Sequence, residues 1–154
     1  MVITASGTWT ASRGGSASGS RHFASLLLSK TEKHPCDFHV FCNNGSGYTI
    51  SIHPACIAFL HEMKVHYSKI AIYTSSSAEY ASKICDKITT RYLQAYPDNK
   101  TLFFKILSAD DCPIEDRLRT KDMLLFGSLE DVVFVDDDPY YSIRSQNDNV
   151  IHVR

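Results

Sequence analysis

The chain of 154 residues has the length of one domain, and its 44% hydrophobic and 21% charged residues are typical of a globular protein with an ordinary core. A formal net charge of −1 argues against electrostatic binding of nucleic acid or an anionic membrane surface, and no apolar run approaches the roughly 20 residues needed to span a bilayer. Five cysteines, an odd number without a C-x-x-C pair, predict free thiols in a reducing compartment and give little support to a zinc site.

The first 20 residues are almost entirely Ser, Thr, Gly and Ala. Such a segment buries too little apolar surface to offset the entropy lost on ordering. Residues 1–22 are therefore predicted to be a disordered tail, and residues 23–154 the folded domain. The lack of acidic residues before Glu32 also resembles an organelle transit peptide, but the glycines weaken the helix that such a peptide needs, so a flexible tail is favoured.

The region from residue 37 onward predicts a β-hairpin followed by a helix. Two runs of alternating polarity flank the turn segment 43–47, Asn-Asn-Gly-Ser-Gly, whose residues tolerate the positive φ of a tight turn. Pro54 suits the first turn of the helix. The apolar face of that helix has the spacing i, i+3, i+4 and i+7, with Cys56, Phe59, Leu60 and Met63.

A strand and a second helix come next. Residues 69–73 form a short apolar run that is typical of a buried strand. Ser76 and Glu79 then have capping-box spacing, which predicts a helix that reaches about Ile88.

The last third of the chain continues the alternation. Residues 102–107 and 132–135 are strand candidates, and a weaker helix is predicted around 120–127 between them. Strands that alternate with helices predict an α/β fold with a mainly parallel sheet.

Strand 132–135 runs directly into three consecutive carboxylates, Asp136, Asp137 and Asp138, followed by Pro139. Ligands of parallel sheets collect beyond the carboxyl ends of the strands, and three like charges there need a cation or a set of donors. Carboxylate oxygens suit Mg²⁺, a hard ion. The alternative is a solvated acidic turn, because Asp and Pro are ordinary turn formers.

Polar residues also follow strand 69–73. Thr74, Ser75 and Ser76 stand where a helix opens, and free N–H groups and hydroxyls at such a place can bind a phosphate oxygen. Lys121 lies between the two strand ends along the chain and offers a point charge for a phosphate. In this order the three parts form the skeleton of a phosphoryl-transfer site. The alternatives are that Thr74 only caps its helix and that Lys121 is a solvated helix residue.

The segments "IYTSSSAEYA", "TKDMLLFG" and "VVFVDDDPYYS" together resemble the phosphatase domain of the RNA polymerase II C-terminal-domain phosphatases and their small relatives such as Dullard. This family lies within the haloacid-dehalogenase superfamily, and the resemblance covers roughly 37–154. It implies a Rossmann-like, mainly parallel sheet flanked by helices, with the hairpin near the start of the domain. It also implies that Thr74 and Ser75 bind phosphate, that Lys121 neutralises it, and that Asp136 and Asp137 bind Mg²⁺. Strands 69–73 and 132–135 are expected to be central neighbours, so that Thr74 and Asp136 open onto one cleft.

The resemblance fails at the catalytic motif. The family carries "DLDET" on a strand before the hairpin, where the first Asp is the nucleophile and the second the general acid and base. This chain has no Asp before Asp37. Residues 27–31, Leu-Leu-Ser-Lys-Thr, are the nearest degenerate copy, with Leu27 in place of the nucleophile and Ser29 in place of the acid and base. Either the site has decayed, or the chain is a truncated or spliced form that lacks the catalytic strand.

Three functions remain open from the sequence. The first is a catalytically impaired domain of the phosphoprotein Ser/Thr phosphatase type that binds phosphate or protein. The second is an active Mg²⁺-dependent protein Ser/Thr phosphatase, and the third is a non-catalytic domain like that of a mitochondrial presequence-translocase subunit. The expected partner is a phosphoprotein or phosphopeptide, Mg²⁺ binding is expected to be weak or absent, and the nucleus or cytoplasm is the expected compartment, with the mitochondrion as the alternative.

Overall fold

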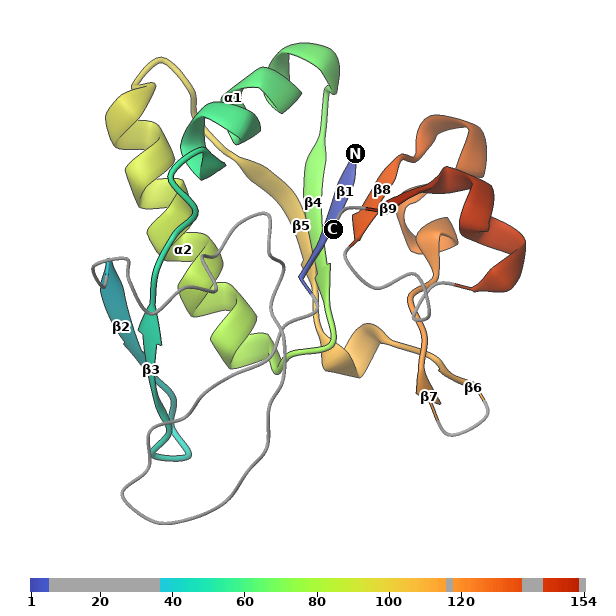
Figure 1. Ribbon diagram of the computed structural model, residues 1–154, viewed down its shortest axis with the longest axis horizontal. Helices are drawn as coiled ribbons and strands as arrows, with labels where there is room; N and C mark the ends of the chain where they lie inside the picture. Colours follow the sequence, from blue (N-terminus) through green and yellow to red (C-terminus); the bar gives the residue numbers. More distant parts are fainter. Residues whose placement is uncertain (6–36, 116–117, 137–142, 153–154) are drawn as a thin grey trace.

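The computed structural model describes residues 1–5, 37–115, 118–136 and 143–152. Strands and two α-helices make up the first two thirds of this part of the chain, and the last third contains short 3₁₀-helices and strands (Figure 1). In chain order the elements are β1 (Val2–Ala5), β2 (Phe38–Phe41), β3 (Gly47–Ile50), α1 (Cys56–His66), β4 (Ile70–Thr74), α2 (Ala78–Ala95), β5 (Phe103–Leu107), η1 (Ala109–Asp111), β6 (Ile114–Glu115), β7 (Leu118–Arg119), η2 (Met123–Phe126), η3 (Leu129–Asp131), β8 (Phe134–Asp136), η5 (Arg144–Asn149) and β9 (Val150–His152).

The main sheet has the strand order β5-β4-β1-β8-β9, and all its neighbouring strands run parallel. The prediction of an α/β fold with a mainly parallel sheet is therefore confirmed. Helices α1 and α2 lie on one face of this sheet, and the 3₁₀-helices η2 and η3 lie on the other (Figure 1). Two small antiparallel ribbons, β2-β3 and β6-β7, stand outside the main sheet.

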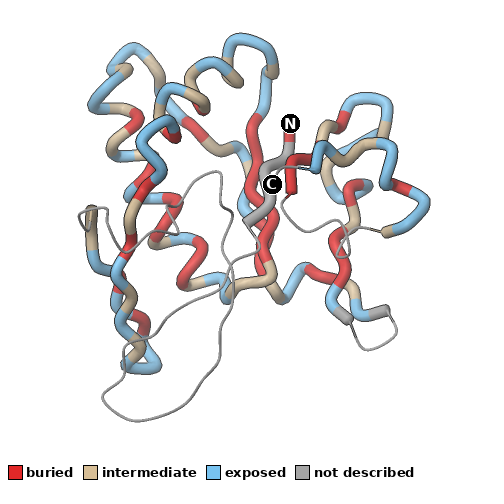
Figure 2. The backbone as a smooth tube through the Cα atoms, in the orientation of Figure 1, coloured by how far each residue is buried: buried red, intermediate tan, exposed pale blue. Residues whose placement is uncertain are grey.

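Strand β4 separates two apolar clusters because its side chains alternate between the faces of the sheet. Ile70 and Ile72 join the larger cluster, together with buried residues from both helices and from the hairpin. Ala71 and Tyr73 join the smaller one, with Met123 from η2. All five residues of β4 are buried (Figure 2), which is the burial that the uninterrupted apolar run predicted.

Strand β1 overturns two predictions. The described start of the chain, residues 1–5, lies in the middle of the sheet and not in a disordered tail, and residues 6–22 of the predicted tail lie outside the described residues. Strands β4 and β8 are therefore not neighbours, because β1 pairs with both. The N-terminal ammonium donates to the carbonyl of Lys69 at 3.0 Å, and its burial lowers the pKa of the amine. For residues 1–5 the prediction was wrong because it rested on the average composition of 20 residues, whereas β1 has only four residues and pairs with strands more than 60 residues away.

The predicted hairpin is confirmed. Strands β2 and β3 pair antiparallel around a turn in which Gly45 has a φ of 78°, a conformation that favours glycine. Asp37 ties the base of the hairpin to helix α2, because its carboxylate accepts from the guanidinium of Arg91 at 2.5 Å and from the backbone N–H of Ile52 at 2.6 Å. The hairpin is thus fixed to the helical face of the domain.

Helix α1 confirms the predicted apolar face. Cys56 and Leu60 are fully buried, and Phe59 and Met63 pack against the same cluster. The helix begins at Cys56, so Pro54 lies just before it and not in its first turn.

Helix α2 differs from its prediction at both ends. The residue before its first turn is Ser77, and Glu79 does not complete a capping box with Ser76, since its carboxylate accepts from the backbone of Asn43 at 2.9 Å and from Lys83 at 2.6 Å. The helix also continues to Ala95, beyond the expected end. Tyr92 continues the buried stripe of the helix by one further turn and explains the extra length.

The expected helix around 120–127 is only the 3₁₀-helix η2. Gly127 ends it with a φ of 135°. Strand β9 was missed, because three residues after a polar run give no periodic signal. Among the described helices, none combines the length and apolarity that crossing a membrane requires.

Burial of two thiols predicts a loss of stability at alkaline pH. Burial raises the pKa of Cys56 and Cys85 from the ordinary 9.0 to about 12. The unfolded chain ionises these thiols at a pH where the folded chain keeps them protonated, so their contribution is complete below pH 9.0 and is lost as the pH rises toward 12. We expect urea titrations across this window to give a falling free energy of unfolding.

The control for this prediction is the double variant Cys56→Ala, Cys85→Ala. Its stability at neutral pH is lower because two small cavities form. Across the alkaline window, the free energy of unfolding of this variant is expected to fall less steeply than that of the wild type. An identical decline would show that the two thiols do not cause it.

Candidate phosphate site at the carboxyl edge of the sheet

Three parallel strands end at one edge of the sheet. β4 ends at Thr74 and β8 ends at Asp136, and β1 lies between them. The register pairs Ala5 with Thr74 on one side of β1 and Ile3 with Val135 on the other. Thr74 and Asp136 therefore lie at the same edge, one strand apart, and this is the edge where ligands of parallel sheets bind.

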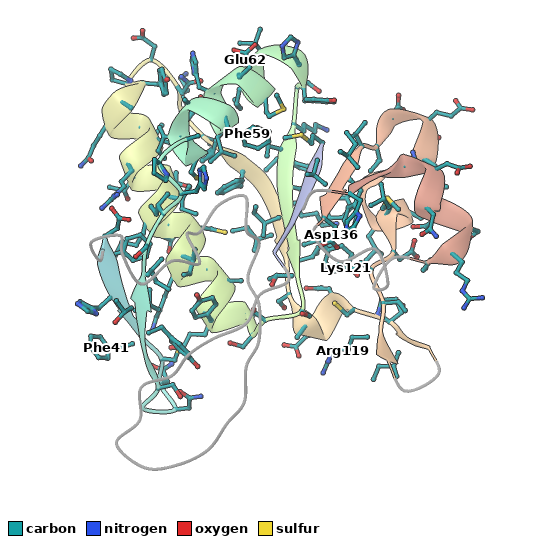
Figure 3. The ribbon with its side chains drawn as sticks, viewed as in Figure 1. Phe41, Phe59, Glu62, Arg119, Lys121 and Asp136 are labelled. Carbon is teal, nitrogen blue, oxygen red and sulfur yellow. The ribbon has the colours of Figure 1, made fainter. Side chains whose placement is uncertain are left out.

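Lys121 and Asp136 form a buried ion pair. The Nζ atom of Lys121 donates to Oδ2 of Asp136 at 3.0 Å, and the two side chains are 1% and 0% exposed (Figure 3). The same Nζ atom lies 5.9 Å from the centre of the Phe134 ring, on the strand that carries Asp136. Two buried charges are tolerated only because each neutralises the other. The alternative of a solvated helix residue is therefore wrong for Lys121, while its role toward phosphate stays a prediction.

Thr74 is completely buried at the end of β4. Its Oγ1 atom accepts the backbone N–H of Ser76 at 3.1 Å, so the hydroxyl organises the turn that leads into α2. Ser75 is half-buried in that turn. The predicted phosphate ligands Thr74 and Ser75 thus lie between a strand end and the first turn of an 18-residue helix.

Tyr73, to which the sequence assigned no role, bonds to the backbone on either side of this edge. Its hydroxyl donates to the carbonyl of Asp111 at 2.9 Å and accepts the backbone N–H of Asp122 at 3.4 Å. Burial raises the pKa of Tyr73, so the hydroxyl stays protonated and keeps its donor. The tyrosine therefore fixes the backbone next to Lys121.

The remaining predicted site residues lie outside the described residues. These are the degenerate motif candidates Leu27 and Ser29 and the second predicted metal ligand, Asp137. The described residues contain no group of three or more His, Cys, Asp or Glu side chains that could hold a metal ion. Of the predicted Mg²⁺ ligands only Asp136 is described, and its carboxylate already accepts from Lys121. One carboxylate paired with an ammonium group does not make the oxygen set that Mg²⁺ requires.

Comparison with known families gives a clear match. A family model described as "NIF: NLI interacting factor-like phosphatase" matches residues 24–154. The chain belongs to this family. The match spans most of the chain, and it agrees with the haloacid-dehalogenase-type parallel sheet and with the resemblance to C-terminal-domain phosphatases.

A solved structure supports the same assignment for this NLI interacting factor-like domain. It is that of the fission yeast RNA polymerase II C-terminal-domain phosphatase Fcp1, in a variant form bound to beryllium fluoride. The TM-score is 0.56 at 25% sequence identity, and the match covers 75% of this chain and 30% of that chain. This chain therefore corresponds to less than a third of the yeast structure. No curated protein matches the chain.

Proposed function

We propose that this domain binds phosphoproteins or phosphopeptides and hydrolyses them poorly or not at all. The family match supports a phosphatase-type domain. The observation that carries the proposal is the sequence of β1, Val-Ile-Thr-Ala, on the strand between β4 and β8. Hydrolysis through an aspartyl-phosphate needs a carboxylate nucleophile, and in the family that carboxylate belongs to a strand before the hairpin. β1 precedes the hairpin and holds no carboxylate, and residues 24–31, where the family match begins, contain no Asp or Glu either.

The groups proposed to hold phosphate are those that remain at the carboxyl edge. The Thr74 hydroxyl, the turn through Ser75 and the start of α2 supply hydrogen-bond donors and the positive end of a helix dipole. Lys121 supplies a buried positive charge that an incoming phosphate oxygen would share with Asp136. Such groups bind and orient a phosphate ester without providing the atom that attacks phosphorus.

The test of this proposal is a titration of a phosphoserine peptide followed by ³¹P NMR. The phosphoserine resonance is expected to shift with added protein, and an excess of the unphosphorylated peptide is expected not to reverse the shift. Thr74→Val removes the hydroxyl at nearly constant volume and is expected to weaken binding about tenfold or more, because a hydrogen bond to a charged group is worth about 1.5–3 kcal/mol.

Thr90→Val is the matched control for Thr74→Val. The Thr90 hydroxyl also bonds to the backbone, at the carbonyl of Asp86 at 2.8 Å, but it lies on the body of α2. The Thr90→Val variant is expected to bind the phosphoserine peptide with the affinity of the wild type. Equal weakening in both variants would indicate a general loss of folding, and no weakening in Thr74→Val would remove Thr74 from the site.

Weak Mg²⁺ binding is a further part of the proposal. It would depend on Asp136 together with Asp137, since two carboxylates leave most of the coordination shell to water. Calorimetric titration of Mg²⁺ is expected to give a small binding heat that Asp137→Asn removes, and this substitution keeps the Lys121 pair intact. Tight binding that survives Asp137→Asn would place the cation elsewhere.

A further inference from the structure

Gln146 joins the last 3₁₀-helix to the segment that carries Lys121. It is 3% exposed, although it stands in the polar run Arg144–Asn149 that forms η5. Its Nε2 atom donates to Oδ1 of Asp122 at 2.7 Å, and its Oε1 atom accepts the backbone N–H of Met123 at 2.8 Å. Both polar atoms of one buried amide are thus used on the two residues that follow Lys121.

Three successive backbone N–H groups after Lys121 are held by side chains. The N–H of Asp122 is bound by the Tyr73 hydroxyl, that of Met123 by Gln146, and that of Leu124 by Oδ1 of Asp122 at 3.0 Å. The same Oδ1 atom accepts a hydrogen bond from the amide of Gln146. The side chains of Tyr73, Asp122 and Gln146 together therefore fix the backbone of this segment. A segment of this kind lets a long, flexible lysine side chain keep one position while its charge is buried.

We propose that Gln146 is a positioning residue, which holds Lys121 against Asp136 and thereby sets the affinity of the edge for a phosphate oxygen. The inference about phosphate rests on the proposed function, whereas the positioning of the ion pair does not. Gln146 lies beyond Asp136 along the chain and returns to the segment of its partner Lys121. The helix η5 leads into β9, which pairs with β8 at Asp136, so Gln146 links the segment after Lys121 to the strand that carries its partner.

A second amide in the same 3₁₀-helix provides the comparison. Asn149 donates from Nδ2 to the carbonyls of Leu129 and Val132, and so it fixes η3 and the approach to β8. Among the described residues, the side chain of Asn149 bonds to this region and not to the segment after Lys121. Loss of either amide removes two hydrogen bonds, but only Gln146 is expected to act on the ion pair.

The first experiment is a double-mutant cycle on stability. Gln146→Met and Asn149→Leu, which keep the volume but not the hydrogen bonds, are each made in the wild type and in a pair-free background, Lys121→Met with Asp136→Leu. We expect Gln146→Met to raise the unfolding constant at least about threefold more in the wild type than in the pair-free background, the size of coupling seen between residues of one network. Asn149→Leu is expected to lower the free energy of unfolding equally in the wild type and in the pair-free background. Equal costs of Gln146→Met in the two backgrounds would overturn the inference.

The second experiment measures the affinity for inorganic phosphate at a temperature where each variant is folded. Gln146→Met is expected to weaken binding about tenfold, the effect of misplacing one charged hydrogen-bond donor, whereas Asn149→Leu leaves it unchanged. Unchanged affinity in Gln146→Met, with a wild type that binds, would overturn the role toward phosphate. A wild type that does not bind phosphate would instead contradict the proposed function, and the cycle would still decide whether Gln146 positions the pair. If the pair-free background does not fold, the two phosphate affinities decide the inference.

Discussion

Replacing Lys121 with methionine is expected to lower the free energy of unfolding by about 3–5 kcal/mol, the cost of leaving one buried charge without its partner. The methionine fills nearly the same volume, so the loss reports the charge and not a cavity. Asp136 is 0% exposed and loses the ammonium group 3.0 Å from its carboxylate. Urea unfolding followed by circular dichroism measures the change.

Two further variants separate the charge from the packing. Adding Asp136→Leu to Lys121→Met is expected to recover most of the lost stability, since an apolar pair of similar volume is often as stable as a buried ion pair. Lys83→Met breaks the partly exposed pair with Glu79, at 2.6 Å, and is expected to have a much smaller effect because solvent screens that pair. A loss as small for Lys121→Met as for Lys83→Met would contradict the buried pair.

Proline at residue 3 is expected to destabilise the domain by about 3 kcal/mol or more, because it removes a ladder hydrogen bond from a central strand. β1 pairs with β4 through Val2–Ala5 and with β8 through Val2 and Ile3, so the break divides the sheet. Thermal unfolding of Ile3→Pro measures the effect.

The edge strand β9 provides the control for this prediction. Among the described strands β9 pairs only with β8, and Ile151 is 52% exposed. Ile151→Pro is therefore expected to cost less than Ile3→Pro. An Ile3→Pro variant as stable as the wild type would contradict the central position of β1. It would also remove the argument that this central strand lacks a carboxylate nucleophile.

The sequence predicted those elements whose signal is local. The hairpin turn, the apolar run of β4 and the run before Asp136 each carry their own pattern of turn residues or burial, and the structure has all three. The order of the strands is not local. β1 owes its place to pairing with strands more than 60 residues away, and four residues in a Ser- and Gly-rich setting gave no reason to expect it.

The candidate site shows the same division. Thr74, Lys121 and Asp136 could be selected because each follows a recognisable pattern, but the burial of Lys121 against Asp136 depends on the tertiary structure. Gln146 gave no signal at all, because an amide in a polar run is ordinarily a surface residue. Its burial becomes visible only when η5 packs against the segment after Lys121.

The proposed function requires that the domain holds a phosphate ester and does not cleave it. One ³¹P NMR experiment tests both halves: a phosphoserine peptide is mixed with the protein and Mg²⁺, and the spectrum is followed over hours. We expect a shifted phosphoserine resonance and no inorganic phosphate above the protein-free sample. Protein-dependent release of inorganic phosphate that Asp136→Asn abolishes, in a variant shown to be folded, would contradict it and identify an active phosphatase.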